Sequence, residues 1–166
     1  MGNAYSNYKI IDVTPTISTA EYASGDALFN KAEIPNAVLG KGGCAELINI
    51  TVNCKKAAAA EAQMNIILMQ SDQSMEAANE AMNITAVEGT AANFLGTVDI
   101  ATASCLDMGN YVIGMPSSED ISKTSTLPFL IQADSGSTSV FFTVIILGAY
   151  TFAANDFTFR FHIKQR

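Results

Sequence analysis

The fold is decided by two runs near the end of the chain, Val140-Phe141-Phe142-Thr143-Val144-Ile145-Ile146-Leu147 and Phe157-Thr158-Phe159-Arg160-Phe161-His162-Ile163-Lys164. In the second run apolar and polar residues alternate, and a period of two places successive side chains on opposite faces of a strand. We therefore expect this strand to have one buried and one solvent-facing side. The first run is almost wholly apolar, which predicts a strand near the middle of a sheet, covered on both faces. We interpret the region from Ser137 to Lys164 as a long antiparallel hairpin.

The composition indicates one domain with an unusually uncharged surface. At 166 residues the chain is expected to form a single β-sandwich domain, residues 1–166, with a core that requires neither metal nor disulfide. Hydrophobic residues make up 49% and charged residues 15% of the chain, whereas a typical domain has ~25% charged residues. A surface so poor in charge predicts that other copies of the chain cover part of it.

The charge and the apolar runs argue against two classes of partner. The net charge is −7, whereas nucleic-acid binding relies on clustered Lys and Arg. The apolar run from Val140 to Tyr150 is about half as long as a membrane helix requires. We therefore expect neither nucleic acid nor a membrane as a partner. The cysteines, Cys44, Cys54 and Cys105, lack metal-type spacing and are expected to be free thiols in a reducing compartment.

Further strands are expected along the whole chain. Alternation and short apolar runs predict them at Tyr8–Thr14, Ala27–Ile34, Glu46–Cys54, Asn65–Gln70, Phe94–Ala101, Asn110–Ile113 and Leu127–Ala133. Thr85 and Glu88 form a capping-box pair, which predicts one short helix from Ala86 to about Asn93. Loops are expected at Lys55–Ala62 and Met115–Thr126. With about seven to nine strands, the predicted fold class is all-β: a two-sheet antiparallel sandwich, jelly-roll-like, with at most one short helix.

The same alternation predicts the core. In the strand Glu46–Cys54 the apolar residues share one face, and Asn49, Thr51 and Asn53 share the other. The predicted core residues are Ile48, Ile50, Val52, Val140, Phe142, Val144, Ile146, Phe157, Phe159, Phe161 and Ile163.

Residues that could carry catalysis are scarce. His162 is the single histidine, and because no ligand pattern surrounds it, we expect a structural or solvated role. The sequence has no Gly-x-Ser-x-Gly elbow, and Gly40-Lys41-Gly42-Gly43 lacks the Gly-Lys-Ser/Thr ending of a phosphate loop. We expect no catalytic residue, no metal site and no cofactor, and therefore a protein that is not an enzyme.

Basic residues gather in one place on this acidic chain. Arg160, His162 and Lys164 project from the same face of the last strand, and Arg166 follows in register. These four residues form a candidate docking surface for an acidic partner. Charged residues also protect edge strands against unwanted pairing, and this simpler role is the interpretation that we favour from the sequence.

Two stretches resemble a known group of proteins. The first comprises Ile11-Asp12-Val13-Thr14-Pro15-Thr16-Ile17-Ser18, Gly25-Asp26-Ala27-Leu28-Phe29 and Glu33-Ile34-Pro35-Asn36-Ala37. The second comprises Leu127-Pro128-Phe129-Leu130-Ile131-Gln132-Ala133, Gly136-Ser137-Thr138-Ser139-Val140 and Phe157 to Lys164. Together they are similar to small virion structural proteins, of decoration or cement type, from tailed phages that infect aquatic bacteria, cyanophages among them. The resemblance covers about half of the chain and leaves Lys55–Asn93 unmatched.

This resemblance implies a function. It implies a non-enzymatic capsid decoration (cement) protein that assembles as a homotrimer and binds the major capsid protein. It places the chain on the capsid exterior of the virion, after synthesis in the cytoplasm of the bacterial host. The low charged fraction is compatible with that role, because a symmetric oligomer that buries apolar patches favours the assembled state by mass action. A receptor- or glycan-binding module of a phage fibre or knob is the alternative.

Overall fold

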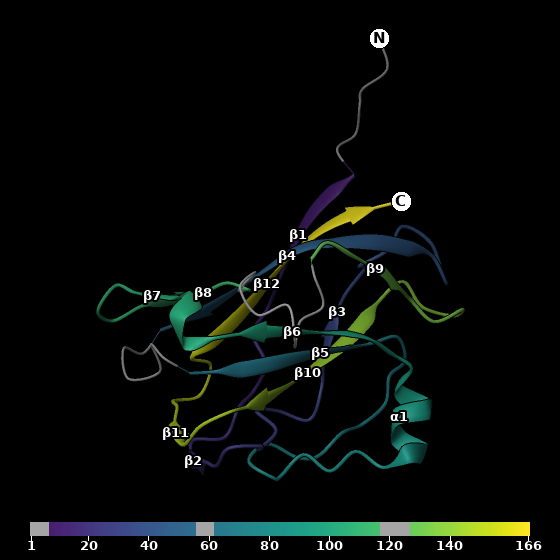
Figure 1. Cartoon of the computed structure of the whole chain (residues 1–166). Helices are drawn as coiled ribbons and strands as arrows, with labels where there is room; N and C mark the ends of the chain where they lie inside the picture. Colours follow the sequence, from purple (N-terminus) through teal and green to yellow (C-terminus); the bar gives the residue numbers. More distant parts are fainter. Residues whose placement is uncertain (1–6, 56–61, 117–126) are drawn as a thin grey trace.

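Figure 1 shows a computed structural model of the chain, which describes residues 7–55, 62–116 and 127–166. The expected loops at Lys55–Ala62 and Met115–Thr126 lie largely outside these residues. The described strands are β1 (Tyr8–Val13), β2 (Glu21–Tyr22), β3 (Ala32–Ile34), β4 (Cys44–Cys54), β5 (Met64–Met69), β6 (Phe94–Ile100), β7 (Cys105–Asp107), β8 (Val112–Gly114), β9 (Phe129–Gln132), β10 (Val140–Ile146), β11 (Tyr150–Thr151) and β12 (Phe157–Gln165). The described residues also form the helix α1 (Ala86–Ala92) and a 3-10 turn at Thr102–Ser104.

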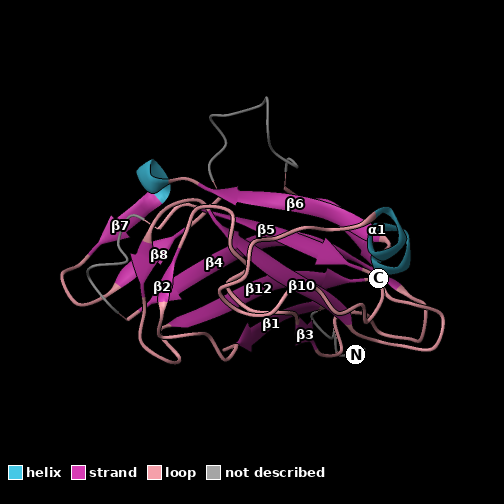
Figure 2. Cartoon of the chain, turned by 90° about the horizontal axis from the view of Figure 1, so that it is seen from below, coloured by secondary structure: helices cyan, strands magenta, loops and turns pink. Residues whose placement is uncertain are grey.

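The strands form two antiparallel sheets packed face to face, so the protein is an all-β sandwich with one short α-helix, as predicted. The large sheet has the order β1-β12-β4-β8-β7, and β9 pairs with the N-terminal end of β4. The small sheet has the order β3-β10-β5-β6. In Figure 1 the large sheet lies above the small sheet, and Figure 2 shows the layers from below, with α1 at one end of them. β2 and β11 pair separately as a two-stranded ribbon.

The core lies between the inner faces of the two sheets and is built around phenylalanine. Phe157, Phe159 and Phe161 of β12 point inward from the large sheet, and each is at most 1% exposed. Phe142 of β10 meets them from the small sheet, with ring centroids 5.2 Å from Phe159 and 4.9 Å from Phe161. Both contacts are edge-to-face, the arrangement that ring quadrupoles favour. The alternation of β12 therefore closes the sandwich.

The predicted hairpin between the two C-terminal runs is wrong. β10 pairs with β3 and β5 in the small sheet, whereas β12 pairs with β1 and β4 in the large sheet. The connection, residues 147–156, is longer than the loops that join most hairpins, and it contains β11. Tyr150 of β11 lies opposite Tyr22 of β2, and the Phe152 ring packs against Tyr22 and Phe157. These contacts hold the connection as it leads the chain from one sheet to the other.

β10 lies in the middle of the small sheet, with its inner face in the core and its outer face covered in part. Its inward residues Val140, Phe142, Val144 and Ile146 are all 0% exposed. On its outer side, Thr143 is also 0% exposed, and its hydroxyl donates to the Phe29 carbonyl at 2.9 Å. Phe141 packs against a second apolar cluster, which is formed by Met69, Met75 and Ala92. The segment that follows β5 therefore covers part of the outer face of the small sheet.

The predicted capping box begins the helix α1. The Thr85 hydroxyl accepts from the Glu88 backbone N–H at 3.2 Å, and the Glu88 carboxylate accepts from the Thr85 backbone N–H at 2.9 Å. The helix ends at Asn93, which has a left-handed backbone with φ 52°, a conformation that Asn tolerates better than most residues. The prediction of a short helix here is confirmed.

Ile48 is the predicted core residue that the structure places outside the core. β4 and β12 shift register at this point, because Asn49 lies opposite His162 whereas Leu47 lies opposite Ile163. Ile48 is therefore the extra residue of a β-bulge and is only half-buried. Beyond the bulge the inward positions change from even to odd numbers, so Leu47 is 0% exposed. The other ten predicted core residues are each at most 3% exposed.

Three strands have no counterpart in the sequence-based prediction. β2, β7 and β11 have two or three residues each, which is too short to show a period of two. Within the described residues, no helix is long and apolar enough to cross a membrane.

Candidate docking surface

The outer face of the large sheet, which we call the docking face, carries the four basic residues predicted from the sequence. The strand register arranges its outward side chains in rows that run across the strands. These rows are Tyr8–Lys164–Glu46–Leu130, Ile10–His162–Asn49, Asp12–Arg160–Thr51 and Thr158–Asn53–Ile113–Leu106. Neighbours in a row have Cβ atoms about 4.5–5.5 Å apart, so Arg160, His162 and Lys164 each have defined neighbours on both sides, whereas Arg166 follows the end of β12.

Arg160 forms a two-pronged pair with Asp12 of β1. Its Nε and Nη2 atoms donate to the two carboxylate oxygens at 2.8 Å each, a geometry that the planar guanidinium matches. The hydrogen bond and the positive charge of Arg160 lower the pKa of Asp12 against the opposing effect of burial, and the carboxylate raises the pKa of Arg160. Both side chains are 45% exposed, so solvent screens the pair. Arg160 therefore already has an acidic partner within its own chain.

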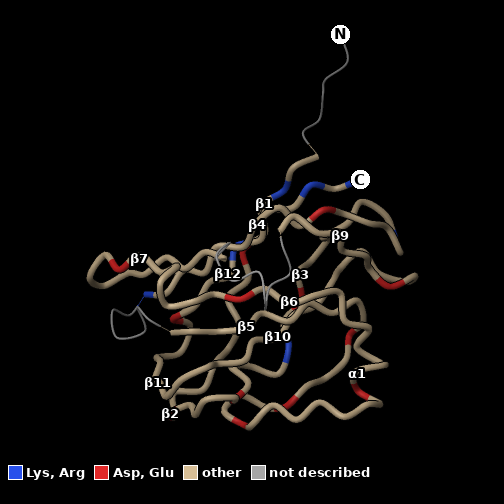
Figure 3. The backbone as a smooth tube through the Cα atoms, viewed as in Figure 1, with Lys and Arg blue, Asp and Glu red and all other residues tan. Residues whose placement is uncertain are grey.

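Two further basic residues also have partners on this face. Arg166 Nη2 lies 3.3 Å from Glu46 Oε2. The Lys164 ammonium lies 5.7 Å from the centre of the Tyr8 ring, a cation–π contact, and Lys164 is also opposite Glu46 in the register. Figure 3 shows basic and acidic positions interspersed on β1, β12 and β4. Arg160 and Arg166 therefore have carboxylate partners and Lys164 has an aromatic one, so the stripe is not a free basic patch.

β12 is not an edge strand, so the interpretation as edge protection is wrong. β12 lies between β1 and β4 and pairs with both. A strand with neighbours on both sides needs no protection against further pairing. His162 is half-buried on this strand, with its Nε2 3.4 Å from Thr51 Oγ1. The basic residues thus occupy the interior of a broad sheet face.

The sequence analysis missed the two acidic residues of this face, Asp12 and Glu46. Asp12 and Arg160 are 148 positions apart, and only the order of the strands brings them together. The signal for Asp12 was its alternation with Tyr8 and Ile10, which predicts a shared face within β1 but not which strand lies beside it.

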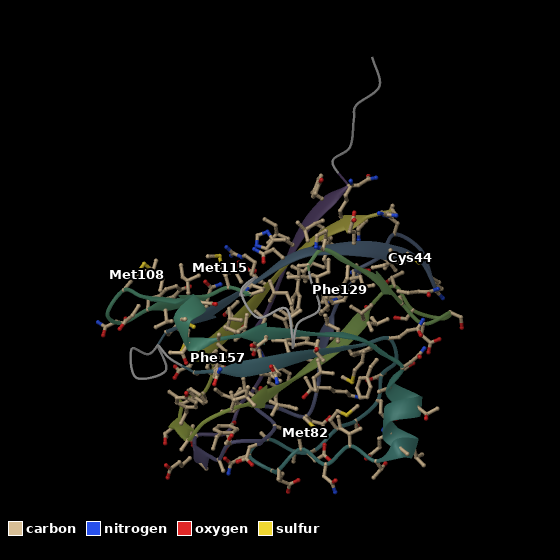
Figure 4. The ribbon with its side chains drawn as sticks, in the orientation of Figure 1. Cys44, Met82, Met108, Met115, Phe129 and Phe157 are labelled. Carbon is tan, nitrogen blue, oxygen red and sulfur yellow. The ribbon has the colours of Figure 1, made fainter. Side chains whose placement is uncertain are left out.

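Large apolar side chains are exposed at both ends of the docking face. At one end Tyr8 and Ile10 are each 62% exposed and Leu130 is 54% exposed. At the other end the β7–β8 hairpin exposes Leu106, Met108, Tyr111 and Met115. Figure 4 shows Met108 and Met115 on this hairpin, which projects from the body of the sandwich. A solvated sheet face is normally polar, so exposed apolar groups gathered on one face indicate a surface that another molecule covers.

A second concave site lies on the outer face of the small sheet. It is a groove of about 520 Å³, lined by Gln63, Asn65, Ile67, Thr97, Asp99, Ile145 and Leu147. These residues come from the neighbouring strands β10, β5 and β6 and from positions next to their ends. The groove and the docking face lie on opposite outer faces of the sandwich.

No residue group in the described part of the chain combines three or more His, Cys, Asp or Glu side chains in a way that could hold a metal ion. No family model matches the sequence, and no curated protein matches it.

Proposed function

We propose that the protein is a non-enzymatic capsid decoration (cement) protein of a bacteriophage, which oligomerises and stabilises the head shell. The observation that carries the proposal is the docking face, where large apolar side chains are exposed at both ends and both arginines between them have carboxylate partners. The resemblance of the chain ends to virion structural proteins also supports it. A cement protein acts by binding, so it requires an adhesive surface and no reaction centre.

The docking face combines two properties that favour its coverage by protein. Apolar surface removed from water contributes about 25 cal/mol per Å². Arg160 and Arg166 already have carboxylate partners, and burying a paired charge costs less than burying a lone one. Covering this face is therefore more favourable than covering a basic patch of the same size.

The docking face is also large enough for a stable protein–protein interface. The outward rows hold three or four strands at ~4.8 Å spacing, and the nine residues of β12 at ~3.4 Å each set the length, so the face extends over about 15 Å by 30 Å. This is of the order of the ~800 Å² that each partner buries in a standard interface. One such face can therefore hold a stable contact.

The proposed partners are further copies of the chain, as a homotrimer, and the major capsid protein. A trimer fits sites of three-fold symmetry on the capsid exterior, and the chain would be made in the cytoplasm of the bacterial host. Binding to the assembled shell, and not to its free subunits, stabilises the shell by mass action.

Quantitative mass spectrometry of purified particles tests this function. We expect hundreds of copies per particle, in a fixed ratio to the major capsid protein. A copy number that follows the tail proteins would contradict a role on the head. Light scattering of the purified protein at micromolar concentration tests oligomerisation separately, and a monomer there would contradict the homotrimer.

A second candidate function is a receptor- or glycan-binding module of a phage fibre or knob. The groove on the small sheet favours it, because the groove offers polar side chains around an apolar floor. In that case the copy number follows the tail, and the isolated protein binds host cells.

A further inference from the structure

We infer that the open edge of β1 pairs with the β1 edge of a second copy of the chain, antiparallel and around a two-fold axis. β1 stands at one end of the strand order of the large sheet and pairs with β12. The contact consists of backbone hydrogen bonds along the rim of the sheet, so it leaves the docking face accessible. It goes beyond the proposed function and does not require it.

One hydrogen bond fixes which backbone groups of β1 face away from β12. The Gln165 N–H donates to the Asn7 carbonyl at 2.8 Å, and the register continues this pairing along β1. In an antiparallel pair, hydrogen-bonded positions alternate with positions whose N–H and C=O groups point away. The odd-numbered residues of β1 therefore bond to β12, whereas these groups of Ile10 and Asp12 point to the open edge. Among the described residues, they have no hydrogen-bond partner there.

The sequence of β1 does not protect this edge. Proteins usually protect an exposed edge with a short strand, a proline, a bulge or a projecting charge. β1 has six residues without a proline, and its register against β12 is continuous. Its two charged side chains are engaged within the chain, since Lys9 donates to the Asn36 carbonyl at 3.1 Å and Asp12 pairs with Arg160. The edge is therefore open to a further strand.

The edge-facing residues select the register of the pairing. With Ile10 at the two-fold axis, Ile10 of one copy lies opposite Ile10 of the other, and the two residues exchange a pair of backbone hydrogen bonds. The Ile10 side chain is 62% exposed in the single chain, and here the two aliphatic side chains cover each other, which removes apolar surface from water. A shift of the register by two residues loses this apolar pair.

The charges of the two copies are compatible with this register. Asp12 lies opposite Tyr8 of the other copy, and Arg160 already compensates its charge. The two Asp12 residues are at opposite ends of the paired segment, about 14 Å apart along the strand. Like charges directly opposite each other destabilise a sheet, and this register avoids them, because Lys9 lies opposite Ile11.

These features favour the same strand of a second copy as the occupant. A two-fold contact uses the same surface on both copies, so one open edge supplies both halves of the interface. The two large sheets then form one continuous sheet with a single, wider docking face. Because a two-fold contact joins molecules in pairs, it is distinct from the three-fold contact of the proposed homotrimer and links two trimers where both contacts form.

Amide hydrogen exchange of the full chain, measured by NMR at low and high protein concentration, tests the pairing at the atoms concerned. We expect the Ile10 and Asp12 amides to exchange about tenfold more slowly at high concentration, because pairing gives them acceptors. The Lys9 and Ile11 amides already bond to β12 and are internal references that should stay slow throughout. Fast exchange of the Ile10 and Asp12 amides at high concentration would overturn the inference. Protection that appears only when capsid shells are added would assign the edge to another partner and would also overturn it.

A charge exchange at Ile10 tests the two-fold register. Ile10→Lys and Ile10→Glu each place like charges opposite each other across the axis, so each variant alone should have about half the mass of the original assembly in native mass spectrometry. An equal mixture of the two variants places a lysine opposite a glutamate and should restore the mass. Val87→Lys, at a site on α1 that is 79% exposed, is the control and should leave the mass unchanged. A mixture that fails to reassociate would contradict the register, and none of these results bears on the copy number that tests the decoration function.

Discussion

Replacement of Phe142 by Ala is the perturbation that best probes how the two sheets meet. The Phe142 side chain is 0% exposed, and its ring lies 5.3 Å from Phe29, 5.2 Å from Phe159 and 4.9 Å from Phe161, all edge-to-face. Truncation of a buried Phe to Ala costs about 3–5 kcal/mol. Because three aromatic neighbours lose contacts at once, we expect a loss near the upper end, about 4–5 kcal/mol. For a domain with a free energy of unfolding of about 5–15 kcal/mol, that is a large share.

Urea unfolding followed by circular dichroism measures this loss, and a double-mutant cycle locates it. Phe142→Leu and Phe161→Leu change ring contacts while keeping most of the apolar volume. We expect the two substitutions to be non-additive by about 0.5–1.5 kcal/mol, the energy of an aromatic pair beyond its buried area. Phe94→Leu on β6 is the control, because Phe94 is 42% exposed and the free energy of unfolding should change by less than about 0.5 kcal/mol.

The cycle also distinguishes the sandwich from the hairpin that the sequence suggested. A hairpin that joined Leu147 to Phe157 would place Phe142 opposite His162, with Phe161 on the other face. Phe142 and Phe161 would then be uncoupled. Additive effects in the cycle, or a loss of less than about 1 kcal/mol for Phe142→Ala, would refute the packing described here.

Three other predictions concern the surface. Arg160 lowers the pKa of Asp12, so their ion pair stabilises the fold fully above the ordinary carboxyl pKa of about 3.9, and this contribution is lost as the pH falls through the lowered pKa. Asp12→Asn should therefore flatten the decline in melting temperature below about pH 4. High salt should reduce the difference in melting temperature between the variant and the original protein. Thr85→Ala should cost about 1 kcal/mol at the start of α1, seen as faster amide exchange in that helix, whereas unchanged exchange would show that the capping box contributes nothing. Leu106→Glu should weaken self-association or attachment to particles without changing the melting temperature. Val87→Glu, at a site on α1 that is 79% exposed, is the control and should leave self-association and attachment unchanged. If both variants weaken binding equally, the docking face is not the surface responsible.

The sequence predicted those features that depend on neighbouring residues. A period of two in residues 157–163 is enough to assign the buried phenylalanines, because side chains alternate along any strand. Thr85 and Glu88 are three positions apart, so their capping box forms within one helical turn and needs no other part of the chain. The apolar run of β10 likewise indicated a strand with both faces covered.

What the sequence did not predict depends on contacts between distant residues. β10 and β12 are consecutive long strands, and nothing in either one shows that a ribbon of β11 with β2 will direct them to different sheets. The bulge at Ile48 arises from the match between β4 and β12, and the period of two in β4 hides it. The candidate site shows the same limit, since Arg160 was visible in the sequence but its pairing with Asp12 was not.

Cryo-electron microscopy of particles that contain the protein is the most direct test of the proposed decoration function. We expect density for the sandwich on the exterior of the head, with the outer face of the large sheet against the shell or a neighbouring copy and the groove of the small sheet open to solvent. Density on the tail alone, or a head-bound copy whose Tyr8, Ile10 and Leu106 side chains all face solvent, would contradict it.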